Sequence, residues 1–529
     1  MNYSPIKIID LFAGPGGLGE GFSSLEVNGV YPFRISLSVE MEHSAWKTLR
    51  LRSFIRQFIY SGELIPDEYY QYLAGELGSS PEEILFKKYE KQAQAATDEA
   101  LQLTLGEDND NQVIFDKIKN KLGNDKNWIL IGGPPCQAFS LMGRARNKGK
   151  EGYVAEEDHR HFLYQEYLKI IENFSPAVFV MENVKGILSS KIDGEPIFNK
   201  IKEDLENPGK ALNKEVKATY TIYSLASTND AHADSESPQD PHDFVIKSED
   251  YGIPQARHRV ILLGVRDDIS IVPKKLEKQK KKITIEQVIG DLPKLRSGLS
   301  KNKGRDTSEG WAKVIRDELY LFLKQPSECT LDKNLTKEIN NTINTIEQNK
   351  LEKGKDCIQP AKDIYRNMPK ELKNWYSKGW KSGVCNHNTR GHMDSDLARY
   401  LFCSTFAKVN SSTENKTRQS PKLKDFPDVL LPNHKNAKSG KFVDRFKVQE
   451  KGLPATTITS HISKDGHYYI HYDSSQCRSL TVREAARIQT FPDNYFFEGN
   501  RTQQYVQVGN AVPPLLAKKI SDIVYKILL

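Results

Sequence analysis

Long hydrophobic runs are missing from this chain of 529 residues. No stretch of about eighteen apolar residues occurs, and a membrane-spanning helix needs roughly that length. The start, MNYSPIKIIDLF, also lacks the charged n-region and the cleavage site of an export signal. These absences argue against a membrane protein or a secreted protein. We expect a soluble protein of the cytoplasm, associated with the nucleoid.

Cysteine is scarce as well, with six residues in the whole chain. Scattered so thinly, they predict no disulfide framework and suit a reducing compartment, where a thiol stays free for chemistry. Lys and Arg outnumber Asp and Glu by 76 to 69, which fits a polyanionic partner but also many ordinary enzymes. The run KKLEKQKKK, from Lys274 to Lys282, fits a solvated linker as well as it fits a phosphate contact.

Short apolar runs alternate with amphipathic segments up to about residue 268. The runs are IKIIDLF, RISLSVE, NWILIGG, AVFVMENV and RVILLGV. This alternation is typical of βαβ units, in which helices cover a mostly parallel sheet. We therefore predict an α/β fold with a Rossmann-like domain over residues 1–268. A charged, helix-prone insertion occupies about residues 50–126.

The composition changes after this first domain. From about Ile269 to Gln449 the chain is polar and rich in Lys and Asn, without clear alternation of strands and helices. We predict a second, smaller mixed domain over residues 269–495. The remaining segment, 496–529, ends in an apolar periodic helix that we expect to pack on the first domain.

A glycine-rich turn, LFAGPGGLGEGF, follows the first predicted strand. Gly14, Gly16 and Gly19 match G-x-G-x-x-G, and Glu40 ends the next strand. Glycines let a ligand approach the backbone, and an acid at the tip of the second strand binds ribose hydroxyls. Both a nicotinamide dinucleotide and S-adenosylmethionine carry such a ribose. The loop alone leaves either cofactor, or a purely structural turn, open.

The strand NWILIGG runs into GGPPCQAFS, which places Cys136 just beyond the carboxyl end of a strand. Ligands bind at that edge in open α/β sheets. A lone cysteine is more often a small core residue. Here two prolines hold the backbone directly before the thiol, and this setting favours a nucleophile.

Two further motifs carry charged side chains. Glu182 ends the strand AVFVMENV, where an acid taken alone is usually a solvated or capping residue. In YGIPQARHR, the side chains of Gln255, Arg257 and Arg259 alternate along an extended backbone and therefore point to one face. Two guanidinium groups on one face need anionic or carbonyl partners, although pairing with surface acids is an equally ordinary outcome.

Together these motifs carry a family resemblance. GGPPCQAFS, with DLFAGPGGLGEGF before it and MENV, YGIPQARHR and QVGNAVPP after it, resembles the cytosine-5 DNA methyltransferases of bacterial restriction-modification systems. The motifs stand in the family's usual order, and mainly the insertion and the polar module lie outside them. The resemblance implies transfer of a methyl group from S-adenosylmethionine to C5 of a flipped-out cytosine, through a bond between a cysteine and C6.

The resemblance also assigns roles to residues. Cys136 is the nucleophile, Glu182 acts at N3 of the base, Arg259 contacts O2, and Arg257 braces the site. Asn183 helps to hold the loop. Cofactor contacts are implied for Phe12, Gly14, Gly16, Gly17, Leu18, Glu40, Met41, Pro135, Leu163 and Asn510.

Within that set, Glu40 is expected on the ribose and Met41 against the adenine. The acid at the adenine amino group stays open between Asp108 and Asp110. Gln137 and Ser140 are expected to face the DNA near the flipped nucleotide.

The implied partner is double-stranded DNA, bound by a monomer and shared with a cognate restriction endonuclease that acts on the same site. The long segment between QARHR and PATTIT, residues 269–449, is the expected reader of bases through the major groove. The stretch RSLTVREAARIQTFPD is expected to bridge the two domains. No metal is expected, because Cys385, His387, His392 and Cys403 fit the spacing of no standard zinc site.

Three other classes of protein are alternatives to this interpretation of the motifs. A dinucleotide-dependent oxidoreductase has no use for Pro-Pro-Cys-Gln, ENV and QARHR together. A tRNA cytosine-5 methyltransferase shares the chemistry, but it usually has a small recognition region. A non-catalytic DNA-binding relative is expected to have lost the cysteine or the glutamate, and both are present here.

Overall fold

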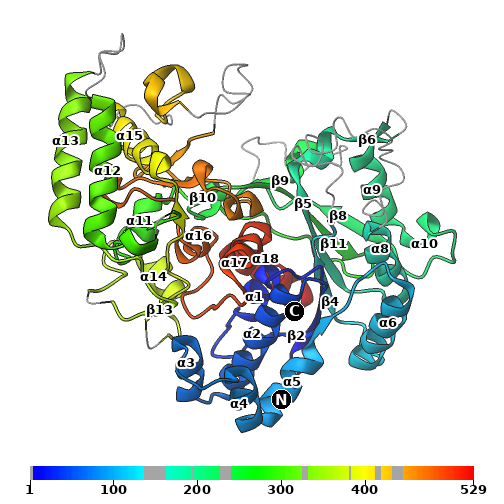
Figure 1. Ribbon diagram of the computed structural model, residues 1–529. Coiled ribbons are helices and arrows are strands. Elements are labelled where there is room, and N and C mark those ends of the chain that lie inside the picture. The colour runs from blue at the N-terminus through cyan, green and yellow to red at the C-terminus, as the bar shows by residue number, and fades with distance from the viewer. Residues whose placement is uncertain are drawn as a thin grey trace.

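The fold is taken from a computed structural model. It describes residues 4–135, 163–192, 195–226, 240–301, 303–323, 332–360, 362–380, 383–411, 419–431 and 445–529. A central sheet with its helices forms one side of the molecule, and the helices α12, α13 and α15 form the other side (Figure 1). No helix in these ranges is long and apolar enough to cross a membrane.

The central sheet has the strand order β3-β2-β1-β4-β5-β11-β8, and β9 also pairs with β11. The strands from β3 to β5 are parallel, whereas β11 runs antiparallel to β5, β8 and β9. The predicted mostly parallel α/β sheet is therefore confirmed. The strands are β1 (Ile6–Leu11), β2 (Phe33–Glu40), β3 (Ala100–Gln102), β4 (Ile129–Gly132), β5 (Val178–Val184), β8 (Tyr220–Tyr223), β9 (Val245–Lys247) and β11 (His258–Arg266).

Both faces of this sheet are covered by helices. Successive residues of β1 point to opposite faces, so Ile8 joins one hydrophobic core and Ile9 joins the other. Burial on both faces explains why the strands read as continuous apolar runs and not as alternating ones. The helices on one face are α1 (Gly17–Ser23) and α18 (Pro514–Leu528); those on the other are α6 (Asp108–Leu122), α8 (Leu163–Phe174) and α9 (Ile197–Glu206).

The insertion between β2 and β4 forms helices that share a separate hydrophobic core, which also includes Cys385 from the polar module. It also supplies β3 at the edge of the sheet, a strand of three residues that the sequence did not predict. α4 shows why a helix forms here, since Pro81 starts it, Glu82 and Glu83 lie in its first turn, and two lysines end it. The helices are α2 (His43–Ser61), α3 (Asp67–Ala74), α4 (Pro81–Lys88) and α5 (Glu90–Glu99).

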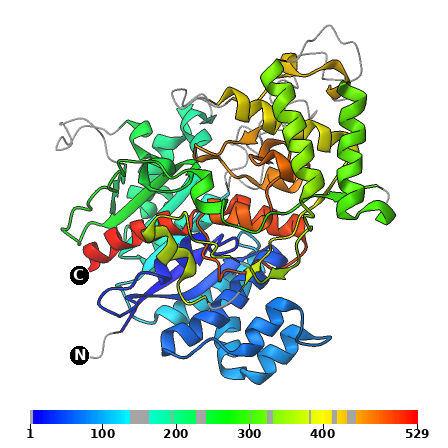
Figure 2. The ribbon, with the colours of Figure 1, turned by 90° about the vertical axis from the view of Figure 1, so that its left-hand side faces the viewer.

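The polar module contains long helices that its composition concealed. In α13, Leu335, Ile339 and Ile346 recur on one face and are buried against α15. Figure 2 shows α12 and α13 from the side, well above the insertion helices. The helices are α11 (Ile285–Ile289), α12 (Ser308–Leu323), α13 (Lys333–Gln348), α14 (Lys370–Ser377) and α15 (Asp394–Asn410).

The chain after residue 455 returns to the sheet. Leu480 and Phe491 belong to the same hydrophobic core as Ile8 and Val524, so residues on both sides of the predicted boundary at 495 share one core. α18 packs against α1. The two helices before it are α16 (Val482–Ile488) and α17 (Arg501–Asn510).

Short elements complete the fold. They are α10 (Pro208–Ala211), β6 (Lys191–Ile192), β7 (Glu195–Pro196), β10 (Gln255–Ala256), β12 (Gly298–Leu299), β13 (Cys357–Ile358), β14 (Val384–Cys385), β15 (Gly391–His392), β16 (Val448–Gln449), β17 (Ala455–Thr456) and β18 (Ile470–His471). β10 pairs with β17 next to the end of the central sheet, which brings residues 255 and 455 together.

Candidate active site

The glycine turn after β1 needs its glycines for two different reasons. Gly14 and Gly16 have φ values of 56° and 91°, in the region that favours glycine. A Cβ on Gly17 would lie 2.2 Å from the carbonyl oxygen of Val512, so α1 approaches the C-terminal segment too closely for any side chain. A Cβ on Gly14 would meet nothing within 4 Å. That side of the turn is open to a ligand.

Glu40 ties this turn to the end of β2. Its carboxylate accepts hydrogen bonds from the backbone N–H of Gly14 and of Glu42, each at 2.8 Å. Burial raises the pKa of Glu40, while these two N–H groups act in the opposite direction. A carboxylate has further lone pairs, so it can still accept the hydroxyls of a ribose. Met41 follows with 63% of its surface exposed, next to this acid.

The two candidate acids for an adenine contact differ in their surroundings. Gln102 of β3 is in register with Glu40, so the turn after β3 lies at the same edge of the sheet. There Asp110 already accepts the backbone N–H of Thr104 at 2.7 Å. Asp108 is exposed in the first turn of α6 and has no hydrogen-bond partner among the described residues. Asp108 is therefore the acid with the freer carboxylate.

Other predicted cofactor residues are placed as follows. Phe12 is half-buried, and Leu18 is buried in the core, so Leu18 can reach a cofactor only through its backbone. Leu163 begins α8 and lies against the turn after β3, since its Cδ2 is 3.0 Å from a Cβ built on Gly106. Asn510 is exposed at the end of α17.

The chain that leads to the predicted nucleophile runs past Glu182. A Cβ on Gly133 would lie 3.2 Å from Oε2 of Glu182, and the side-chain amide of Asn183 donates to the carbonyl of Pro134 at 3.4 Å. Pro135 is the last described residue of this segment and is half-buried. Cys136, Gln137 and Ser140 lie outside the described residues.

Glu182 and Arg259 form an ion pair across neighbouring strands. Nε of Arg259 lies 2.9 Å from Oε1 of Glu182, and the two side chains are 16% and 14% exposed. The register of β5 with β11, which sets Ile261 opposite Glu182, brings them together. Arg259 also donates to the carbonyl of His258 at 2.9 Å. A carboxylate and a guanidinium thus meet beside the segment that ends in Pro135.

Arg257 is buried and finds carbonyl partners instead. It donates to the carbonyl oxygens of Ile458 at 2.8 Å and of Gly509 at 3.3 Å. Burial and the nearby Arg259 lower the pKa of Arg257 to about 9. Gln255 reaches the same segment, because it accepts the backbone N–H of Ile458 at 2.7 Å. Through these hydrogen bonds, the QARHR motif holds the C-terminal part of the chain, residues 455–510, against the sheet.

Sequence reasoning missed a buried acid beneath the glycine turn. Asp10 is 1% exposed, and neither carboxylate oxygen has a hydrogen-bond partner among the described residues. Its Oδ2 is 2.8 Å from a Cβ built on Gly19, and burial raises the pKa of Asp10 to about 8. An acid inside the apolar run IKIIDLF was the available signal.

Cys385 and His387, two of the four residues weighed as a zinc site, have other partners. Cys385 forms a disulfide with Cys357, which the scarcity of cysteine did not lead us to expect. His387 contacts the hydroxyl of Thr481 and the carbonyl of Pro293, each at 2.9 Å. Cys403 is a free, buried thiol. Within the described part of the chain, no group of three or more His, Cys, Asp or Glu residues could hold a metal ion.

Comparison with known proteins gives consistent matches. The model of the family described as C-5 cytosine-specific DNA methylase matches residues 83–226 and 240–526. A type II methyltransferase of Bacillus paralicheniformis is 33% identical over 98% of this chain and 99% of its own length. A type II methyltransferase of Thalassovita gelatinovora is 24% identical, with 98% of each chain covered.

One solved structure from E. coli supports the fold. It is described as a DNA modification methyltransferase encoded within a prophage, and it is 18% identical with a TM-score of 0.51 over 99% of both chains.

Proposed function

Because this chain belongs to the family of C-5 cytosine-specific DNA methylases, we propose that it transfers the methyl group of S-adenosylmethionine to C5 of a cytosine in duplex DNA. The observation that carries the proposal is the position of one ion pair. Glu182 and Arg259 meet 2.9 Å apart, and Glu182 lies against Gly133, three residues before Cys136 in the sequence.

The chemistry requires a nucleophile because C5 of cytosine does not attack a methyl group unaided. In the proposed reaction the thiolate of Cys136 adds to C6, and the displaced electron pair moves into the ring toward N3 and C5. Glu182 donates a proton or a hydrogen bond at N3. Arg259 holds the Glu182 carboxyl and contacts O2 of the base. After methyl transfer, a base removes the C5 proton and the thiolate leaves C6.

The methyl donor supplies an electrophilic sulfonium methyl group. The residues at the sheet edge fit its nucleoside: Glu40 accepts the ribose hydroxyls, Met41 lies against the adenine, and Asp108 accepts from its amino group. Phe12, Pro135, Leu163 and Asn510 complete the walls. Gly14 leaves one side of the turn open for the methyl donor, and the donor contacts the backbone of Gly16, Gly17 and Leu18.

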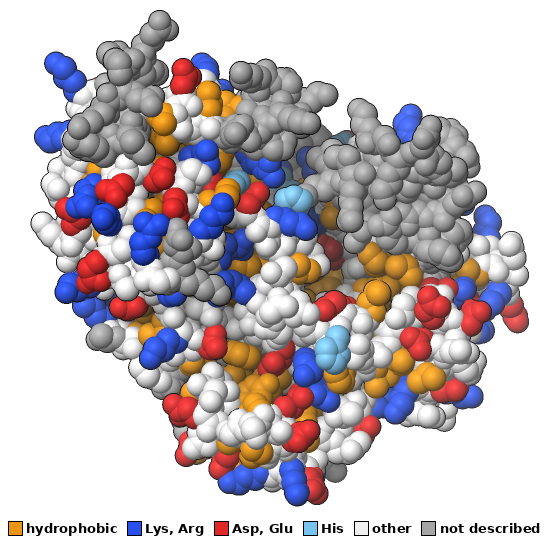
Figure 3. Space-filling view, in the orientation of Figure 1, with side chains coloured by type: hydrophobic (Ala, Val, Ile, Leu, Met, Phe, Trp, Pro, Cys, Tyr) orange, Lys and Arg blue, Asp and Glu red, His pale blue; other side chains and the backbone are white. Residues whose placement is uncertain are grey.

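The cytosine must leave the duplex before this chemistry, at a cost of a few kcal/mol. We assign recognition of the flanking bases to residues 269–449 and contacts near the flipped nucleotide to Gln137 and Ser140. Figure 3 shows the surface hollowed between the α12–α15 side and the sheet side, with Lys and Arg side chains along one wall. Such a basic hollow suits the phosphates of a duplex.

The proposed biological setting is restriction-modification in the bacterial cytoplasm. Two full-length relatives are type II methyltransferases. The enzyme would then act as a monomer on DNA and protect the site that a cognate restriction endonuclease cleaves.

A radioactive methyl-transfer assay tests the function. We expect the wild-type protein to label plasmid DNA and to leave tRNA unlabelled, and bisulfite sequencing of the plasmid identifies the target cytosine. Cys136→Ser should abolish transfer while the protein still binds the cofactor. Labelling of tRNA alone would overturn the choice of DNA, and full activity of Cys136→Ser would overturn the nucleophile.

The covalent step has its own test. DNA with 5-fluorocytosine at the target should form a complex that survives denaturation, because no proton can leave C5. Wild-type enzyme that methylates normal DNA but never forms this complex would contradict the bond to C6.

A further inference from the structure

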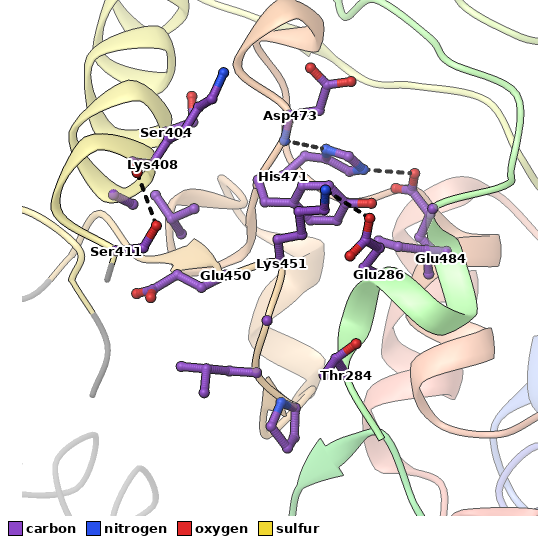
Figure 4. A pocket seen from close by; sticks show the side chains of 18 of the residues that line it. Thr284, Glu286, Ser404, Lys408, Ser411, Glu450, Lys451, His471, Asp473 and Glu484 are labelled. Atoms are coloured by element: carbon purple, nitrogen blue, oxygen red, sulfur yellow. Dashed lines mark hydrogen bonds and ion pairs between the residues drawn. The ribbon is translucent and has the colours of Figure 1, made fainter. Parts of the chain in front are cut away.

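A wide cleft of about 1260 Å³ lies beside the candidate active site and is not part of it. Its walls come from the segment after β11 together with α11, from α15, and from the chain around β16 and β18. Figure 4 shows Ser404 and Lys408 of α15 on one side, with Glu286 and Glu484 across from them. The cleft reaches Ala256, the residue next to Arg257 of the QARHR motif.

Lysines from four separate segments converge on this cleft. The last three residues of the run KKLEKQKKK line it together with lysines from three later segments. Folding alone brings these positively charged groups around one hollow. The six are Lys280, Lys281, Lys282, Lys294, Lys408 and Lys451.

The carboxylates of the cleft are already occupied. Glu286 pairs with Lys451, and Asp473 pairs with Lys294, both at 2.8 Å. Glu484 accepts hydrogen bonds from Nη1 and Nη2 of Arg478, each at 2.7 Å. The other two acids are also engaged: Glu249 contacts His258 at 2.9 Å, and Glu450 accepts the backbone N–H of Gln419 at 2.6 Å.

Two of the lysines that line the cleft have no acidic partner among the described residues. Lys282 pairs with Asp250 at 3.3 Å, and Lys408 pairs with Glu338 at 2.6 Å outside the cleft. Lys280 and Lys281 are exposed and have no carboxylate partner among the described residues. A concave surface with surplus positive charge concentrates field lines and attracts a polyanion.

We propose that this cleft binds the phosphodiester backbone of duplex DNA on one side of the target cytosine, through Lys280 and Lys281. The inference rests on the proposed DNA methyltransferase activity. The ammonium group of lysine is a flexible point charge, which suits contacts to phosphates that carry no sequence information. Ala256 alternates with Arg257 and Arg259, so the cleft lies on the other face of the QARHR strand from Glu182, and a duplex whose cytosine lies at Glu182 would pass over this strand to reach the two lysines.

The test compares Lys280→Ala/Lys281→Ala with the wild type on a fluorescent duplex of about 40 base pairs and arbitrary sequence, by anisotropy across a range of salt concentrations. We expect roughly 10-fold weaker binding at low salt, and a slope of log affinity against log salt that is smaller by about 2. Lys87→Ala/Lys91→Ala, which removes two exposed lysines of the insertion, is the matched control and should bind like the wild type.

Methylation kinetics separate this inference from the proposed function. The double variant should show a raised KM for DNA and an unchanged kcat, since neither lysine touches the reacting atoms. Wild-type affinity and salt slope in the double variant would overturn the cleft assignment while leaving the methyltransferase activity intact. A wild-type protein that neither binds nor methylates DNA would overturn both.

Discussion

Nε of Arg259 lies 2.9 Å from Oε1 of Glu182, across the antiparallel pair of β11 and β5. The pair is partly exposed, at 16% and 14%, and is therefore not a fully buried structural bridge. Glu182 also lies against Gly133. One acid is thus held by a guanidinium on one strand and faces the segment that leads to Cys136.

The first prediction concerns this acid. Glu182→Gln keeps the shape of the side chain but removes the proton donor at N3, so kcat should fall roughly 10²–10⁴-fold with little change in melting temperature. Asp268→Asn is the matched control, since it breaks the pair with Arg266 at the other end of β11. The measurement is the methyl-transfer rate of both variants. A normal kcat of Glu182→Gln would show that Glu182 takes no part in catalysis.

The second prediction concerns the close approach of α1 to the C-terminal segment. Gly17→Ala should destabilise the protein by about 1–3 kcal/mol, because its Cβ would lie 2.2 Å from the carbonyl oxygen of Val512. Gly304→Ala, where a Cβ meets nothing within 4 Å, should leave stability nearly unchanged. Denaturant unfolding measures both, and equal stability of the two variants would contradict the packing described.

The third prediction is a loss of stability in acid. Burial lowers the pKa of both His387 and His471 to about 4. Between pH 6.5 and pH 4 the unfolded chain takes up protons at these positions and the folded chain does not, so stability falls as the pH falls. The loss is at most about 3 kcal/mol for each histidine.

A substitution of His471 tests whether this histidine causes the loss of stability in acid. His471→Gln should flatten the dependence of melting temperature on pH in that window, whatever its effect at neutral pH. His242→Gln, at an exposed position, serves as the control. An unchanged pH slope in His471→Gln would show that His471 does not cause it.

The fourth prediction concerns the loss of stability as the pH rises toward 8. Burial raises the pKa of Asp10 to about 8, so the folded chain holds a proton that the unfolded chain releases above its ordinary pKa near 4. Stability contributed by this proton is complete below pH 4 and is lost as the pH rises through 8. Asp10→Asn should therefore gain melting temperature over the wild type as the pH rises from 5 to 8. A constant difference between the two proteins across that range would count against a protonated Asp10.

Several elements were predictable because their signals are local. The runs IKIIDLF and AVFVMENV are continuous and apolar, as strands buried on both faces must be, and they form β1 and β5. The positive φ values of Gly14 and Gly16 follow from a turn that only glycine adopts easily. Strand β3 was missed because three residues are too few to show a period. In α13, the few Leu and Ile residues lie among many polar ones, so the overall composition of the segment hid the helix.

The sequence by itself determined which reactive groups the protein carries and how the backbone is shaped next to them, because prolines and glycines restrict only their immediate neighbours. Tertiary structure decided which groups meet. The register of β5 and β11 joins Glu182 to Arg259, the fold carries Val512 onto Gly17, and it gathers lysines from residues 280 to 451 around one cleft. Such contacts depend on strand order and on packing between distant segments, for which no local pattern exists.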